Sequence, residues 1–184
     1  MKKLGFLLLI LIFSVGISFA QSDIGLKSIG GKLGFVMPED PIDNTFGLGV
    51  VADLGTITPA IALQAHVEYW GKSYDVGYYE WTFSEIIIGA TAKYYFPTQG
   101  IMKFYGGGGL DFIIGNSSGE YTGTNPYYTN TDVSDSDTDI GFHLCGGGEY
   151  PLSESMTGFA ELKYTLDGAD FFSIFAGVKF KMGQ

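Results

Sequence analysis

The sequence contains no arginine and only one cysteine among its 184 residues. Its 20 acidic residues outnumber its 10 lysines, and the formal net charge of −10 makes nucleic acid, itself a polyanion, an unfavourable partner. Cys145 has no second cysteine with which to form an internal disulfide, so other interactions must hold an exported chain together. Charged residues make up only 16% of the chain, whereas typical soluble domains have about 25%.

The first 20 residues have the features of a cleavable signal peptide. The basic start MKK precedes a short apolar stretch, and the sequence SFA then supplies the small residues that a signal peptidase accepts. A retained membrane anchor would need a longer apolar run, and no later stretch is apolar enough for a transmembrane helix. We therefore predict that residues 1–20 are removed and that residues 21–184 form one domain.

Apolar and polar residues alternate along most of this domain, and no helical period of 3.6 residues persists. Strict alternation is typical of β-strands whose two faces meet different surroundings. A strand needs roughly 9 to 11 residues to cross a bilayer. The alternation predicts eight strands, at residues 28–37, 45–55, 60–71, 81–96, 101–115, 138–150, 156–167 and 171–182.

The connections between these segments differ in length in a regular way. The short ones at 56–59, 97–100 and 151–155 each contain a proline, which cannot donate a hydrogen bond to a β-ladder. Longer connections follow the first, third and fifth segments, and the longest spans residues 116–137. Outer-membrane barrels combine short periplasmic turns with longer external loops. The pattern predicts an all-β fold, an eight-stranded antiparallel up-and-down transmembrane β-barrel in the outer membrane of a diderm bacterium.

One face of each strand is expected to contact lipid, while the other lines the lumen. A soluble barrel would instead turn the apolar faces inward, but the polar faces carry too few charges for a soluble surface. Eight strands also enclose little space. The predicted lumen network contains Lys32, Asp53, His66, Glu68, Glu85, Lys93, Lys103, Asp111, His143, Glu149, Glu161, Lys163 and Lys179, and Lys181 brings the lysines to six against six carboxylates. Because a buried charge is costly unless it is paired, this balance predicts a plugged lumen.

Two glycine runs interrupt the apolar pattern, in KFYGGGGLDF (103–112) and LCGGGEYP (144–151). Neither has the Gly-Lys-Ser/Thr ending of a P-loop or the spacing of a dinucleotide-binding loop. On neighbouring barrel strands, such runs remove side chains from both sides of the wall. We expect bulky lumen side chains such as Tyr105 or Phe159 to lean toward this thin part of the wall.

His66 and His143 are the only histidines, and both fall on the predicted lumen face. An enzyme would use His143 as a base for Cys145, but a lipid-modifying site of this kind should open toward lipid. We therefore favour a hydrogen-bonded lumen network and expect neither catalytic activity nor a cofactor.

Asp135, Asp137 and Asp139 are spaced like the start of a calcium-binding loop. The glycine that should follow is Ile140, and the glutamate of the twelfth position is Gly146. A solvated acidic loop is the favoured interpretation, with weak divalent bridging to lipopolysaccharide left as an alternative.

KFYGGGGLDF and, above all, GFHLCGGGEYPLSESMTGFAELKY (141–164) resemble the glycine-rich strand, proline turn and aromatic-x-Glu-x-x-Tyr return of small eight-stranded outer-membrane β-barrel proteins. The resemblance implies assembly by the outer-membrane barrel machinery, in contact with outer-membrane lipid and lipopolysaccharide. The long connection at residues 116–137 mixes tyrosines with small polar residues, a composition that suits recognition. We therefore predict a structural or surface-interaction role through external loops, with a possible surface ligand at residues 116–137. A narrow channel or carrier for a small molecule, or a lipid-modifying enzyme, stays open as an alternative.

Overall fold

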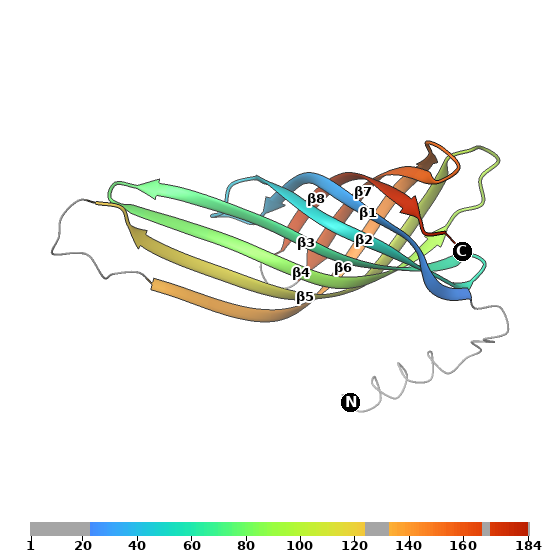
Figure 1. Ribbon diagram of the computed structural model, residues 1–184. Coiled ribbons are helices and arrows are strands. Elements are labelled where there is room, and N and C mark those ends of the chain that lie inside the picture. The colour runs from blue at the N-terminus through green and yellow to red at the C-terminus, as the bar shows by residue number, and fades with distance from the viewer. Residues whose placement is uncertain (1–22, 124–132, 167–169, 184) are drawn as a thin grey trace, which may run out of the picture.

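The fold is a closed barrel of eight antiparallel strands (Figure 1). A computed structural model describes residues 23–123, 133–166 and 170–183. Each strand pairs with its neighbours in the sequence, and β1 pairs with β8 to complete the ring. The strands are β1 (Asp23–Pro38), β2 (Thr45–Thr58), β3 (Ile61–Val76), β4 (Tyr79–Tyr95), β5 (Lys103–Tyr121), β6 (Val133–Pro151), β7 (Met156–Leu166) and β8 (Phe171–Lys181).

The predicted up-and-down barrel is therefore confirmed. None of the described residues forms a helix long and apolar enough to cross a membrane. The predicted signal peptide, residues 1–20, lies outside the described residues. We call the end of the barrel where β1 begins and β8 ends the terminal end, and the opposite end the distal end.

The outer face of the barrel is apolar around its whole circumference. Each strand contributes a large apolar side chain to it, with exposed fractions from 41% for Val67 to 68% for Leu33. The others are Leu48, Ile88, Leu110, Leu144, Leu162 and Ile174. A continuous exposed apolar surface of this kind is unfavourable in water and favourable in a bilayer. The apolar side of the alternation therefore faces outward, as the sequence predicts.

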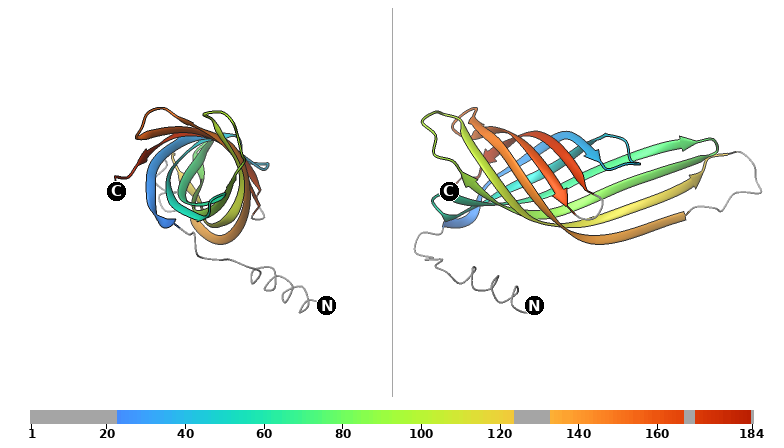
Figure 2. Two further views of the ribbon diagram at one scale, coloured as in Figure 1. Left: turned by 90° about the vertical axis from the view of Figure 1, so that its right-hand side faces the viewer. Right: turned by 180° about the vertical axis from the view of Figure 1, so that it is seen from behind.

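Four neighbouring strands extend past the rest of the barrel at the distal end. β3, β4, β5 and β6 contain 16, 17, 19 and 19 residues, whereas β7 and β8 contain 11 each. The pairing of β3 with β2 stops at Trp70, and that of β6 with β7 stops at Phe142. Figure 2 shows the extra length as a curved sheet. We call residues 71–76, 79–84, 115–121 and 133–139 the projecting sheet.

The projecting sheet corrects both ends of the predicted long loop at residues 116–137, of which residues 124–132 lie outside the described residues. Residues 116–121 belong to β5 and residues 133–137 to β6, and Asn116 pairs with Ser136 across the two strands. The connection from β3 to β4 likewise shrinks to Gly77 and Tyr78, where Gly77 has a φ of 68°, a conformation that favours glycine. Hydrophobic alternation could not reveal residues 116–121 and 133–137 as strands, because few apolar residues stand on either face there.

Buried side chains line the lumen in two layers. The layer near the distal end is apolar and consists of Val36, Trp70, Ile87, Ile113, Phe171 and Phe175, all at most 3% exposed, with Ile42 packed against it. Below it, toward the terminal end, the inward-facing side chains are mostly charged or hydrogen-bonding. This polar layer contains most of the residues that the sequence singles out.

Candidate functional site

The polar layer is built from ion pairs between strands that are distant in the sequence. Glu68 on β3 lies 2.8 Å from the Nζ atoms of both Lys32 on β1 and Lys163 on β7. Glu161 on β7 continues the chain of charges, with its oxygens 3.3 Å from Lys32 and 2.9 Å from Lys93 on β4. All five side chains are at most 4% exposed. Each lysine therefore has a carboxylate partner, as burial of charge requires.

A second group of charges lies nearer the terminal end. Lys179 on β8 lies 2.7 Å from carboxylate oxygens of both Asp53 and Glu149. Asp53 also accepts hydrogen bonds from Ser28 and Gln64, and Glu149 accepts one from Tyr95. These hydroxyl and amide donors are uncharged, so counting charges in the sequence could not identify them. The one sequence feature that pointed to any of them is the position of Gln64 on the same strand face as His66.

The two histidines converge on one carboxylate from β5. His66 Nε2 lies 2.9 Å and His143 Nδ1 lies 3.0 Å from Asp111 Oδ1. Thr91 Oγ1 lies 2.9 Å from His143 Nε2 on the other side of that ring. Each of these four residues is at most 4% exposed. We call His66, Asp111 and His143 the histidine–aspartate cluster.

This geometry argues against a catalytic pair of His143 and Cys145. Both ring nitrogens of His143 are directed elsewhere, toward Asp111 and Thr91. Thr91, His143 and Asp111 have the hydroxyl–imidazole–carboxylate order of a hydrolase triad. Their burial, however, leaves a substrate no access to the hydroxyl. The arrangement therefore does not form an accessible catalytic site.

Three of the predicted lumen lysines and carboxylates lie elsewhere. Lys103 and Lys181 are exposed and line a cavity at the terminal end, outside the buried layer. They stand at the first position of β5 and the last position of β8, at the open rim of the barrel, where each still pairs with a neighbouring strand. Glu85 lies near the distal end, where it accepts a hydrogen bond from Trp70 Nε1 at 3.1 Å.

The glycine runs lie on adjacent strands, as expected. Gly147 faces the lumen, and a Cβ atom there would lie 2.7 Å from the hydroxyl oxygen of Tyr105. The Tyr105 ring thus leans over this part of the wall and donates a hydrogen bond to Glu161 at 2.8 Å. Phe159 leans instead against Gly177 on β8, where a Cβ atom would lie 2.7 Å from its ring. The expectation is met by Tyr105, while Phe159 contacts a different glycine.

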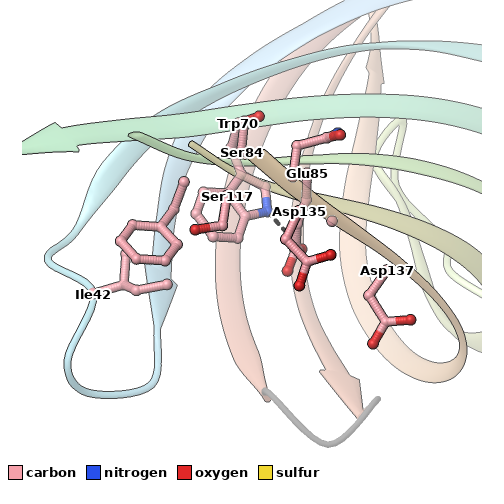
Figure 3. Close-up of a pocket in the computed structure, with 10 residues that line it drawn as sticks. Ile42, Trp70, Ser84, Glu85, Ser117, Asp135 and Asp137 are labelled. Atoms are coloured by element: carbon pink, nitrogen blue, oxygen red, sulfur yellow. Dashed lines mark hydrogen bonds between the residues drawn. The ribbon is translucent and has the colours of Figure 1, made fainter. Parts of the chain in front are cut away.

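A cavity of about 200 Å³ opens at the distal end, where the projecting sheet leaves the barrel (Figure 3). Trp70 and Ile42 supply apolar surface, and Glu85, Asp135 and Asp137 supply carboxylates. In Figure 3, Ile42 lies on one side of the cavity and Asp137 on the other. The three aspartates predicted in a loop, Asp135, Asp137 and Asp139, therefore lie on an extended strand, β6. A strand separates alternate residues by about 7 Å and cannot wrap them around one calcium ion.

The distal end carries most of the excess negative charge of the described residues. It has a single lysine, Lys72, and exposed aromatic side chains at Tyr78, Tyr79 and Trp81. Its acidic residues are Glu39, Asp40, Asp43, Asp75, Glu80, Glu85, Glu120, Asp135, Asp137, Asp139 and Asp170. Eleven acidic side chains against one lysine produce a strongly negative potential at this end.

Solved structures with this architecture come from several bacteria. Neisserial surface protein A superposes with a TM-score of 0.63 at 18% identity, over 85% of this chain and 97% of that one. A major outer membrane protein of Thermus thermophilus gives 0.67 at 12% identity, over 85% and 98%. Ail, the attachment invasion locus protein of Yersinia pestis, in complex with the heparin analogue sucrose octasulfate, gives 0.54 at 13% identity, over 85% and 97%.

These likenesses are too distant to show more than the fold. No curated protein is detectably similar to this chain in sequence. The model of one protein family does match it, over residues 5–182. That match covers almost the whole sequence and agrees with the closed barrel and its apolar outer face. The chain belongs to the family of the outer membrane protein β-barrel domain.

Proposed function

We propose that this protein is a sealed outer-membrane barrel that binds positively charged partners through its distal end, at the cell surface, and has no catalytic role. The acidic distal end carries this proposal, with eleven acidic side chains and one lysine among the described residues. The longer strands also lie at this end, which in outer-membrane barrels is the external one. The apolar belt would contact outer-membrane lipid, into which the barrel assembly machinery would insert the chain.

Charge determines which partners suit this surface. A negative potential raises the association rate of cations and repels anions. Ail binds a sulfated sugar analogue, a polyanion, in its solved complex. A ligand of that kind would be repelled here, and lipopolysaccharide phosphates would need divalent cations to bridge them to the carboxylates. A basic peptide or a basic protein surface is the favoured partner.

The distal cavity can hold one basic side chain of such a partner. Its volume of about 200 Å³ is below the range of about 300–1,000 Å³ typical of small-molecule sites. The aliphatic stem of a lysine or arginine would contact Trp70 and Ile42, while its charged head would reach Asp135 and Asp137. The exposed tyrosines of the projecting sheet add amphipathic contact area of the kind enriched at interfaces.

Neutralising the cavity carboxylates should weaken this binding. We expect Asp135→Asn/Asp137→Asn to raise the Kd for a lysine-rich peptide roughly tenfold at low salt, since each exposed pair is worth about 0.2–1 kcal/mol and the whole field also weakens. The measurement is titration of the peptide onto the full chain in bilayer nanodiscs.

The control is Asp23→Asn/Glu154→Gln, which removes the same charge from exposed positions at the terminal end. It should leave the Kd within twofold of the wild-type value. Equal weakening by both variants would reduce the proposal to an effect of net charge. Tighter binding of a sulfated polysaccharide than of the peptide would contradict it outright.

The filled lumen should prevent ion flow. Six buried apolar side chains above a layer of paired charges support this proposal. We expect the full chain in a planar bilayer to give no current steps above the leak of protein-free bilayers, even in concentrated salt. Reproducible steps from the wild-type protein would favour the channel alternative instead.

A further inference from the structure

The histidine–aspartate cluster has the composition and spacing of a metal site. His66, Asp111 and His143 each offer one ligand atom, and these atoms all lie within 4.8 Å of one another. Two imidazoles and a carboxylate suit zinc and neighbouring transition metals, whereas calcium and magnesium prefer oxygen ligands alone. We propose that the lumen of this barrel binds one transition-metal ion of the zinc class at these three residues.

Two buried polar atoms of the cluster have no hydrogen-bond partner among the described residues. They are Asp111 Oδ2 and His143 Nδ1, in side chains that are fully buried. His143 Nδ1 lies 3.0 Å from Asp111 Oδ1, but not in the orientation of a hydrogen bond. Buried polar groups are nearly always satisfied, and exceptions commonly mark an ion or a water. A metal ion between them would satisfy both atoms.

The surroundings orient the ligands as a metal site requires. A metal-binding histidine usually donates its other N–H to a neighbouring oxygen, which fixes the tautomer and the ring. Thr91 Oγ1, 2.9 Å from His143 Nε2, can accept that hydrogen bond. His143 Nδ1 is then left unprotonated and directed toward Asp111, as ligation demands.

Glycines on the neighbouring strands leave room for the cluster. A Cβ atom at Gly89 would overlap Asp111 Oδ1 and lie 2.6 Å from His66 Nε2. A Cβ atom at Gly109, in the first glycine run, would lie 2.7 Å from His143 Cε1. Any larger residue at either position would displace a ligand side chain. The three ligands therefore occupy space that only these glycines make available.

The charges of the lumen tolerate such an ion. The polar layer contains five carboxylates (Asp53, Glu68, Asp111, Glu149 and Glu161) and four lysines (Lys32, Lys93, Lys163 and Lys179). With both histidines neutral, the net charge of the layer is −1. Binding of a divalent ion would change it only to +1. Lys163, 3.6 Å from Asp111 Oδ2, would give up that contact and keep Glu68 at 2.8 Å.

The test measures metal retained by the folded barrel. Because the cluster is buried, the full chain without a histidine tag would be refolded in the presence of zinc chloride and then washed with a chelator to remove ions from the acidic surface. We expect about one zinc per barrel, and at least a tenfold loss of retained zinc in His143→Gln, since even outer-shell changes cost about 10–100-fold in affinity.

Two control variants separate this site from other metal-binding groups. Asp135→Asn/Asp137→Asn removes surface carboxylates, Cys145→Ser removes the thiol two residues along β6, and both should retain zinc at the wild-type level. Refolding the wild type with cobalt gives a second measurement if His143→Gln does not fold, because bound cobalt should show visible absorption bands typical of low-coordinate nitrogen and oxygen ligands. Wild-type barrels without chelator-resistant zinc, or without cobalt bands, would overturn the proposal.

Discussion

Glu68→Gln should lower the free energy of unfolding by about 3 kcal/mol, the lower end of the range found when a buried ion pair loses one partner. Glu68 is the shared partner of Lys32 and Lys163, at 2.8 Å from each, and its side chain is 2% exposed. Glutamine keeps the volume but removes the charge that compensates both lysines. The measurement is urea unfolding of the barrel in lipid vesicles. The folded fraction at each urea concentration is read from the heat-modifiable band in gels.

The matched control is Glu154→Gln, the same substitution at an exposed position in the turn between β6 and β7. Exposed substitutions of this kind usually change stability by no more than about 0.5 kcal/mol. The double variant Glu68→Gln/Lys163→Gln should lose less unfolding free energy than the two single variants lose in sum. The difference should be about 1 kcal/mol or more, because the two side chains interact directly. Additive losses would mean that the pair is not formed in the bilayer.

A few charges suffice to organise the lumen because several of them have two partners each. Lys32 reaches both Glu68 and Glu161, and Lys179 reaches both Asp53 and Glu149. Each lysine thereby ties together strands that are not neighbours in the barrel wall. Backbone pairing alone closes the ring, but the ion pairs fill it and fix the inward orientation of every strand that contributes one. A slip of one residue on any such strand would carry its charge into lipid.

The sequence predicts well which face of each strand is directed outward, because almost no charged residue is tolerated on a face that contacts lipid. Alternation alone predicts that four side chains face the lumen, because the next residue on the same strand is apolar and faces lipid. They are Lys32, Glu68, Lys163 and Glu161. Contacts between strands do not follow in the same way. That His66, Asp111 and His143 meet depends on the stagger of β3, β5 and β6, which pairing and tilt set and which no spacing within one strand reveals.

The ends of the strands are the other part that the sequence could not supply. Alternation stops being informative where a strand leaves the membrane, because water surrounds both faces. It therefore predicts loops at Asn116–Tyr121 and Val133–Asp137, although these residues are paired strands of the projecting sheet. At the opposite end, Lys103 continues the lumen pattern of β5 to the open rim of the barrel, where its side chain is exposed. The distal cavity could not be foreseen for the same reason, since the projecting sheet forms one side of it.

Gly109→Ala should be the most damaging single-methyl change in the first glycine run. Its Cβ atom would overlap the backbone oxygen of Ala90 and lie 2.7 Å from His143 Cε1. The β4 backbone cannot retreat without breaking its pairing with β5 at Thr91 and Gly109. We expect a loss at or above the upper end of the about 1–3 kcal/mol that overpacking typically costs, or failure to fold, measured by the fraction and thermal midpoint of the heat-modifiable band.

Gly106→Ala, three residues earlier on the same strand, is the matched comparison. Its Cβ atom would face outward, with the nearest atom 3.5 Å away in the Phe96 ring, an ordinary van der Waals contact. Both variants gain the same intrinsic preference of alanine over glycine for a strand, so the difference between them isolates the inward clash. Folded Gly109→Ala barrels should also retain less zinc than Gly106→Ala barrels, because the methyl group displaces His143. Equal stability of the two variants would show that Gly109 does not face the lumen. The packing of Gly109 against the histidine–aspartate cluster would then be wrong as well.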